Sequence, residues 1–207
     1  MDRVSQWIST DDWDQIRKRR ILRVLVAYSQ SNFFIHKGVN RGFEYELLKE
    51  FPNYLQRRQK NMKGELSVLF VPVPFEQLLP LLQKGVGDVA AAGLTITAER
   101  QKDVSFTAPY MKNVEEVVVS SPQTPPIQSL DVLQGREAHV LPSTSFAQHL
   151  GLLNRQWLAA GKPIVRMRFA DENLSTEGLL EMVNAGIIPL TVADRHVAEL
   201  WSGVLTN

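Results

Sequence analysis

The sequence contains no cysteine, which excludes disulfide bonds, Cys-ligated zinc and thiol catalysis. It also lacks any apolar run close to the roughly 20 residues that a membrane-spanning helix requires. An excess of one charge is missing as well, since 23 Lys and Arg against 22 Asp and Glu leave a formal net charge of +1. A nearly neutral chain has no general attraction to nucleic acid or to an acidic membrane surface.

Motifs typical of catalysis are absent too. There is no G-x-S-x-G elbow, no G-x-G-x-x-G and no Walker loop. The adjoining carboxylates Glu115 and Glu116 would point to opposite faces of a strand. None of the four histidines is paired at helical metal-ligand spacing: His36, His139, His149 and His196. We therefore predict no catalytic site, no metal and no cofactor.

The N-terminus leaves the cellular compartment open. Met1-Asp2-Arg3 lacks the apolar core of a secretory signal, so the protein is either cytoplasmic or has lost its leader. The absence of cysteine fits the periplasm and the cytosol equally. We interpret the basic run 17–20 as the solvated end of a helix rather than a nucleic-acid or targeting patch.

What the sequence does contain is an alternation of strand and helix patterns, which predicts an α/β fold with a largely parallel sheet. The expected strands span 21–28, 66–71, 89–92, 114–120, 138–141, 164–169 and 188–192. The expected helices span 42–55, 75–84, 97–104, 145–160, 176–185 and 195–201.

The clearest break in composition is "SPQTPP" at Ser121–Pro126, where three prolines in six residues indicate an extended, stiff connection. It divides the chain into two α/β lobes. We expect a lead helix over 1–20, a first lobe over 21–120, a crossover at 121–126 and a second lobe over 127–207.

Polar groups that could bind a ligand follow the expected strand 89–92. Gly93 would let a ligand approach the main chain, and Thr95 and Thr97 offer hydroxyl groups. Arg100 offers a planar fork suited to a carboxylate. The alternative interpretation is a helix cap with a surface ion pair.

The second half of the chain has a comparable cluster. Ser143, Thr144 and Ser145 end a strand and open a helix, where hydroxyls and free N–H groups favour an anion. Helix capping alone would explain one of these three residues. Asp194 also lies between a strand and a helix, as an N-cap or as a partner for a ligand ammonium. Ligands of open α/β sheets bind beyond the carboxyl ends of strands, where these residues are expected.

Together the segments "RGFEYELLKEF" and "GDVAAAGLTITAERQKDVSFTAPY" resemble the family 3 extracellular solute-binding proteins, periplasmic receptors for polar amino acids. The resemblance covers most of residues 21–200. The residues that match the family pattern are Gly42, Phe43, Glu46, Leu47, Gly87, Asp88, Thr95, Thr97, Glu99, Arg100, Phe106, Pro109 and Tyr110.

This resemblance implies two lobes that close on a ligand, with the following roles in the first lobe. Arg100 would hold the ligand carboxylate, beside Thr95 and the Gly93 backbone. Tyr28 or Phe33, just after the first strand, would cover the ligand side chain.

In the second lobe the resemblance implies hydroxyl or N–H contacts from Ser143, Thr144 and Ser145, and an α-ammonium contact from Asp194. Two departures from the family stand out. Family members usually have a Gly-Thr or Gly-Ser pair where this chain has Pro142 and the three hydroxyl residues. They also continue through a strand and helices that return to the first lobe, so we expect a truncated second lobe.

Both departures, and the lead "WDQIRKRRILRVLV", are similar to the sensor modules fused ahead of the catalytic domain in F-type membrane-bound lytic transglycosylases. This implies a periplasmic monomer that binds an amino acid, peptide or muropeptide, without nucleic acid and without the Glu-Ser catalytic part. The alternatives are a stand-alone receptor of an ABC permease and the effector-binding domain of a transcription regulator. The regulator would need a helix-turn-helix that the first twenty residues cannot hold.

Overall fold

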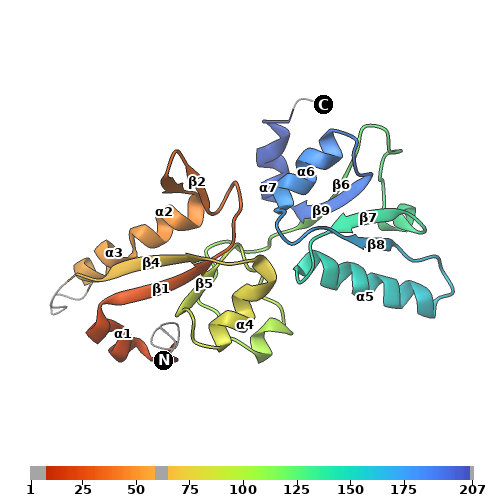
Figure 1. Cartoon of the computed structure of the whole chain (residues 1–207). Coiled ribbons are helices and arrows are strands. Elements are labelled where there is room, and N and C mark those ends of the chain that lie inside the picture. Colours follow the sequence, from red (N-terminus) through yellow and green to blue (C-terminus); the bar gives the residue numbers. More distant parts are fainter. Residues whose placement is uncertain (1–7, 59–64, 206–207) are drawn as a thin grey trace. The chain divides into compact units, whose positions relative to one another are not determined.

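A computed structural model describes residues 8–58 and 65–205 of the chain. The chain forms two compact units, Met1–Phe106 and Thr107–Asn207, each built from a sheet and its helices (Figure 1). The α/β fold class predicted from the sequence is confirmed. Residues 1–7 of the expected lead helix lie outside the described part.

The first unit contains a parallel three-stranded sheet, a small hairpin and four α-helices among its described residues. The strands are β1 (Ile21–Val26), β2 (Phe34–His36), β3 (Val39–Arg41), β4 (Ser67–Pro72) and β5 (Val89–Ala91). The helices are α1 (Trp13–Arg19), α2 (Phe43–Lys49), α3 (Phe51–Arg58) and α4 (Leu78–Gln83).

Strand β1 is the centre of this sheet, in the order β4-β1-β5. Leu22 and Val24 pack with α1, α2 and α3, whereas Leu25 packs with α4 on the other face. Because side chains of a strand alternate between faces and both faces are covered, β1 is an almost continuous apolar run.

Two local features differ from the sequence prediction. The expected helix 42–55 is two helices, because Pro52 has no N–H to continue the hydrogen bonds of α2. The segment expected as a loop contains the β2–β3 hairpin, whose turn residues Lys37 and Gly38 both have positive φ (50° and 76°). Two positive φ angles are the signature of a tight hairpin turn.

A buried ion-pair network ties the start of the chain to the sheet. The Asp88 carboxylate is 2% exposed and accepts a hydrogen bond from Arg23 Nη2 at 2.7 Å and another from Arg19. Arg23 also donates to the Ser9 carbonyl at 2.9 Å. Burial alone would raise the pKa of Asp88, but the hydrogen bonds from Arg23 and Arg19 lower it below its ordinary value. The expectation that the whole basic run is solvated is therefore wrong for Arg19.

The second unit contains a four-stranded sheet in the order β6-β9-β7-β8. The strands are β6 (Glu116–Ser120), β7 (Glu137–Val140), β8 (Arg166–Phe169) and β9 (Leu190–Asp194). The helices are α5 (Ser145–Ala159), α6 (Thr176–Asn184) and α7 (Arg195–Ser202).

The division between the units corrects the predicted domain boundary. Strand β6, which we assigned to the first lobe, pairs antiparallel with β9 along its whole length, so it belongs to the second unit. The proline-rich segment 121–126 also lies there: Ser121 donates its N–H to the Pro189 carbonyl at 2.9 Å, and the Thr124 hydroxyl bonds the same oxygen at 3.2 Å. The boundary therefore precedes β6, near residue 106.

Both faces of the second sheet are covered by helices. Leu190 and Val192 of β9 pack with Phe146 and Trp157 of α5, while a second apolar cluster lies under α6. By the alternation of side chains along a strand, Asp194 lies on the face covered by α5.

Candidate functional site

In the first unit, two of the expected binding residues, Tyr28 and Gly93, lie at the carboxyl edge of the sheet. Val26 and Ala91 are paired neighbours on β1 and β5, and Tyr28 and Gly93 each follow two residues later. Tyr28 is 57% exposed. The structure thus brings Tyr28 and the loop that begins at Gly93 to one edge, as the sequence predicted for a binding site.

The main chain of Gly93 is already engaged. Its N–H donates to both carboxylate oxygens of Glu44, each at 3.0 Å, and Glu44 is only 4% exposed. Because a buried carboxylate needs hydrogen-bond donors, this N–H is not available to a ligand, which corrects the role expected for the Gly93 amide. Sequence reasoning missed Glu44, although it lies inside the quoted motif "RGFEYELLKEF".

Arg100 is held by its own loop. Arg100 is the first residue of the short 3-10 helix Arg100–Lys102. Its backbone N–H donates to the Thr97 hydroxyl at 3.2 Å. Its guanidinium Nη1 donates to the Thr95 carbonyl at 2.9 Å. Thr97 therefore acts as the cap of the alternative interpretation, and Thr95 orients the cation through its main chain.

Phe33 does not belong to this edge. Its side chain is 2% exposed and lies in the core of the first unit, stacked on Phe70 at 6.0 Å between ring centroids and edge-on to Tyr45 at 6.2 Å. The prediction that Phe33 covers a ligand side chain is therefore wrong, and of the two aromatic candidates only Tyr28 is exposed.

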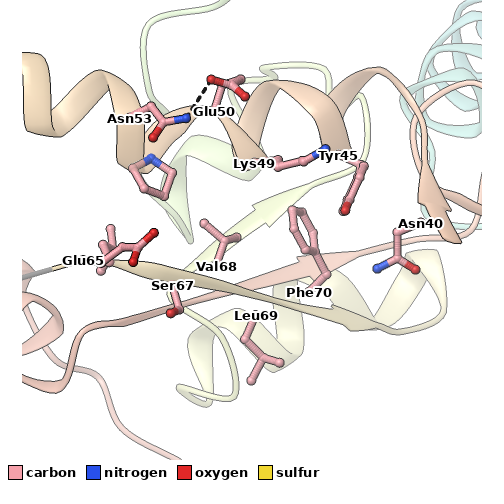
Figure 2. Close-up of a pocket in the computed structure, with 12 residues that line it drawn as sticks. Asn40, Tyr45, Lys49, Glu50, Asn53, Glu65, Ser67, Val68, Leu69 and Phe70 are labelled. Atoms are coloured by element: carbon pink, nitrogen blue, oxygen red, sulfur yellow. Dashed lines mark hydrogen bonds between the residues drawn. The ribbon is translucent and has the colours of Figure 1, made fainter.

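A pocket of about 540 Å³ opens elsewhere in the first unit, between α2, α3 and the edge strand β4 (Figure 2). Phe70 and Val68 form its floor, and two of its charged groups, Lys49 and Glu50, are bonded to neighbours on the same helices. Lys49 pairs with Glu46 at 3.3 Å, and Asn53 donates to Glu50 at 3.0 Å. None of the predicted binding residues lines this pocket.

In the second unit, the hydroxyl cluster follows β7. Thr144 is the N-cap of α5: its hydroxyl accepts from the Ala147 N–H at 3.3 Å and donates to the Leu141 carbonyl at 2.8 Å. The Thr144 hydroxyl hydrogen is therefore used for capping rather than for a ligand. Ser145, the first residue of α5, is 4% exposed, whereas Ser143 is exposed.

The backbone of Ser143 has a conformation that favours glycine. Its φ of 60° lies in the left-handed region, which glycine adopts without strain and other residues rarely do. Ser143 thus takes the conformation that a glycine would take in a Gly-Thr pair, with Thr144 in the place of the threonine.

Asp194 ends β9 and precedes α7. Its side chain makes no capping bond to α7, and within the described part of the chain no hydrogen bond or ion pair to its carboxylate occurs. Burial raises the pKa of Asp194 above its ordinary value; His196 opposes this rise, and Glu116 adds to it. A half-buried carboxylate with unused acceptors is suited to a cation. Asp194 and Ser143 lie at the same edge, because β7 and β9 are parallel neighbours.

Residues 8–58 and 65–205 hold no group of three His, Cys, Asp or Glu side chains that could ligate a metal ion. They also hold no helix of the length and apolarity that crossing a membrane would take.

Two relatives of this chain carry the same name. Membrane-bound lytic murein transglycosylase F of Desulfosudis oleivorans is 31% identical over 188 residues, which are 90% of this chain and 37% of that protein. The protein of the same name from Pseudomonas fluorescens strain Pf0-1 is 26% identical over 195 residues, 94% of this chain and 37% of that protein. The chain therefore spans a little more than one third of the length of these relatives.

Two solved structures of similar fold are ancestral amino-acid-binding proteins. An ancestral arginine-binding protein bound to arginine superposes with a TM-score of 0.72 at 27% identity, covering 90% of this chain and 75% of that one. The ancestral amino acid-binding protein AncCDT-1, a precursor of cyclohexadienyl dehydratase, gives a TM-score of 0.74 at 26% identity, covering 92% and 77%. The sequence profile of one family matches residues 22–195, most of the chain and both units. The chain belongs to the bacterial extracellular solute-binding proteins, family 3.

Proposed function

We propose that this chain is the ligand-binding domain of a larger protein and binds an amino acid or the end of a small peptide. The observation that carries the proposal is Asp194: a half-buried carboxylate at the carboxyl edge of a family 3 domain, with no hydrogen bond from the described residues. Leaving a carboxylate in this state costs free energy. A ligand ammonium would provide the missing partner.

The two charges of an amino acid divide between the two units in this proposal. Arg100, oriented by Thr95, binds the carboxylate from the first unit. Asp194 binds the ammonium from the second.

The class of ligand follows from the solved relatives above 25% identity. The ancestral arginine-binding protein was solved with arginine and also with glutamine, at 27% and 28% identity to this chain. L-arginine and L-glutamine are therefore the first ligands to test. The transglycosylase relatives add a muropeptide, a fragment of the cell wall that also ends in charged groups.

For the whole protein we propose a sensor module fused to a lytic transglycosylase, in the periplasm, since the relatives that match over about 90% of this chain carry that name. In this proposal the chain recognises a small molecule, and the fused domain cleaves peptidoglycan. The family equally includes receptors, so a stand-alone receptor that delivers its ligand to an ABC permease is the second candidate, supported by the amino-acid-binding structures.

Isothermal titration calorimetry of the chain against L-arginine, L-glutamine and a purified muropeptide tests the proposal. A charge-assisted hydrogen bond contributes roughly 1.5–3 kcal/mol, so Arg100→Ala and Asp194→Ala should each weaken binding by at least about tenfold. Arg17→Ala is the matched control, since Arg17 forms only an exposed ion pair with Asp14. Wild-type affinity in both site variants would refute the proposed site, and no binding to any of the three would refute the ligand class.

A further inference from the structure

A second carboxylate lies beside Asp194. Glu116 of β6 is the direct antiparallel partner of Asp194 of β9. Residues directly opposite each other in an antiparallel pair project to the same face, with Cβ atoms about 5 Å apart. The Glu116 side chain is 21% exposed. Two carboxylates therefore share one face at the end of this sheet, where like charges repel each other.

A histidine on the covering helix α5 lies against Glu116 of this pair. His149 of α5 bonds Glu116 Oε2 through Nδ1 at 2.9 Å, and its side chain is 46% exposed. Histidine is the side chain whose charge can change between about pH 5 and pH 8. Protonated His149 compensates the charge of Glu116, whereas neutral His149 leaves that charge to act on Asp194.

Other charged groups nearby are engaged elsewhere or act in a known direction. On α7, His196 acts on Asp194, and Arg195 pairs with Glu115 at 2.6 Å and Glu199 at 3.8 Å. The remaining ionisable groups on packed elements are Arg155 on α5, Glu177 and Glu181 on α6, and Glu137 and His139 on β7, the last two paired at 3.1 Å.

We propose that Glu116 and His149 are positioning residues that act through Asp194 and set the charge with which the site meets a ligand ammonium. The inference rests on the proposed function, in which Asp194 binds that ammonium, and it deepens it by adding a regulation. At neutral pH the pair of Glu116 and Asp194 carries more than one negative charge, and this charge attracts a cation. As pH falls, His149 neutralises Glu116, Asp194 protonates, and the site loses its attraction.

The two positioning residues act with opposite sign. Removing the charge of Glu116 takes away a neighbour that favours protonated Asp194, so the pKa of Asp194 falls. Removing His149 takes away the cation that compensates Glu116, so the pKa of Asp194 rises. A purely structural role of either residue would not produce shifts of opposite direction.

Carbon-detected NMR of the side-chain carboxyl of Asp194 measures this directly in the free chain, with Asp194→Asn identifying the resonance. Glu116→Gln should move the titration midpoint of Asp194 to lower pH, and His149→Gln should move it to higher pH. Glu115→Gln is the matched control, because Glu115 has the same chemistry and adjoins Glu116. The Glu115 side chain is 65% exposed and forms an ion pair with Arg195. In the Glu115→Gln variant, the titration midpoint of Asp194 should equal that in the wild type.

Calorimetry with L-arginine at pH 7.5 and pH 5 provides the functional result. Glu116→Gln should weaken binding about threefold at pH 7.5, as expected for a partly exposed charge pair, and should lose less affinity on acidification than the wild type. An unchanged midpoint in Glu116→Gln, or a shift of both variants in the same direction, overturns the inference. If the wild type binds no L-arginine, the proposed function fails for that ligand, and the titration of Asp194 still decides the roles of Glu116 and His149.

Discussion

The substitution Asp88→Asn should destabilise the first unit strongly and leave the second unit unchanged. Asp88 and Arg23 are 2% and 4% exposed, so neither group can recover its hydration when the other is neutralised. Breaking a buried ion pair by removing one charge typically costs about 3–5 kcal/mol. Arg19, the second partner of Asp88, is 25% exposed and can return to solvent. We therefore expect a loss of stability at the lower end of this range, about 3 kcal/mol.

The assay must resolve the two units, because a chain of two compact units need not unfold in one step. Hydrogen exchange followed by mass spectrometry does so: peptides that cover β1 report on the first unit and peptides that cover β9 on the second. Asp14→Asn is the matched control, since Asp14 and Arg17 form an Asp–Arg pair with side chains 68% and 43% exposed. Such a surface pair is worth at most about 1 kcal/mol.

The contribution of Asp88 to the stability of the first unit should depend on pH in one direction. The folded state lowers the pKa of Asp88, so its contribution to the free energy of unfolding is complete above the ordinary pKa of an aspartate and is lost as pH falls through the folded value. The difference between Asp88→Asn and the wild type should therefore be constant near neutrality and shrink only below about pH 4. If hydrogen exchange in β1 shows that Asp88→Asn destabilises the first unit no more than Asp14→Asn does, the reasoning is refuted.

Three further predictions concern the edge of the second unit. Thr144→Ala should lower the stability of that unit by about 1 kcal/mol through loss of the α5 cap, while Thr144→Ser should retain it, as hydrogen exchange in α5 would show. Ser143→Gly should raise the stability by up to about 1 kcal/mol, because the left-handed backbone no longer carries a Cβ; a lower Tm would contradict this. Asp194→Asn should stabilise the unit at neutral pH, since burial raises the pKa of Asp194 and the ionised form is disfavoured in the fold. That gain should fade in thermal melts as pH falls through the raised pKa, because the wild-type carboxyl is then protonated.

Much of the fold was predictable because its signals are local. The apolar run of β1 is long and buried on both faces, so its pattern could be recognised without knowing its neighbours. The loop from Gly93 to Arg100 was also predictable, since a threonine cap followed by an arginine acts within a few residues. The hairpin β2–β3 was missed because strands of three residues are too short to show an alternation.

The errors concern properties that depend on distant parts of the chain. Phe33 was wrongly assigned to the site because the sequence does not show whether an aromatic residue after a strand points inward. Phe33 points inward because it packs on Phe70 of β4, a residue distant in the sequence. The boundary at 121–126 was wrong because composition does not show that β6 pairs with β9, seventy residues later. The same pairing brings Glu116 to Asp194, and no sequence pattern indicated it.

The most direct test of the central claim, that Arg100 reads a ligand carboxylate and Asp194 a ligand ammonium, combines variants with altered ligands. Calorimetry would compare L-arginine with agmatine, which lacks the carboxylate, and with N-acetyl-L-arginine, which lacks the free ammonium. The account predicts that the wild type prefers L-arginine over each analogue by at least about tenfold, as the loss of a charge-assisted hydrogen bond requires. Arg100→Ala should abolish only the preference over agmatine, and Asp194→Ala only the preference over N-acetyl-L-arginine. Variants that weaken all three ligands equally, or a wild type without preference among them, would contradict the account.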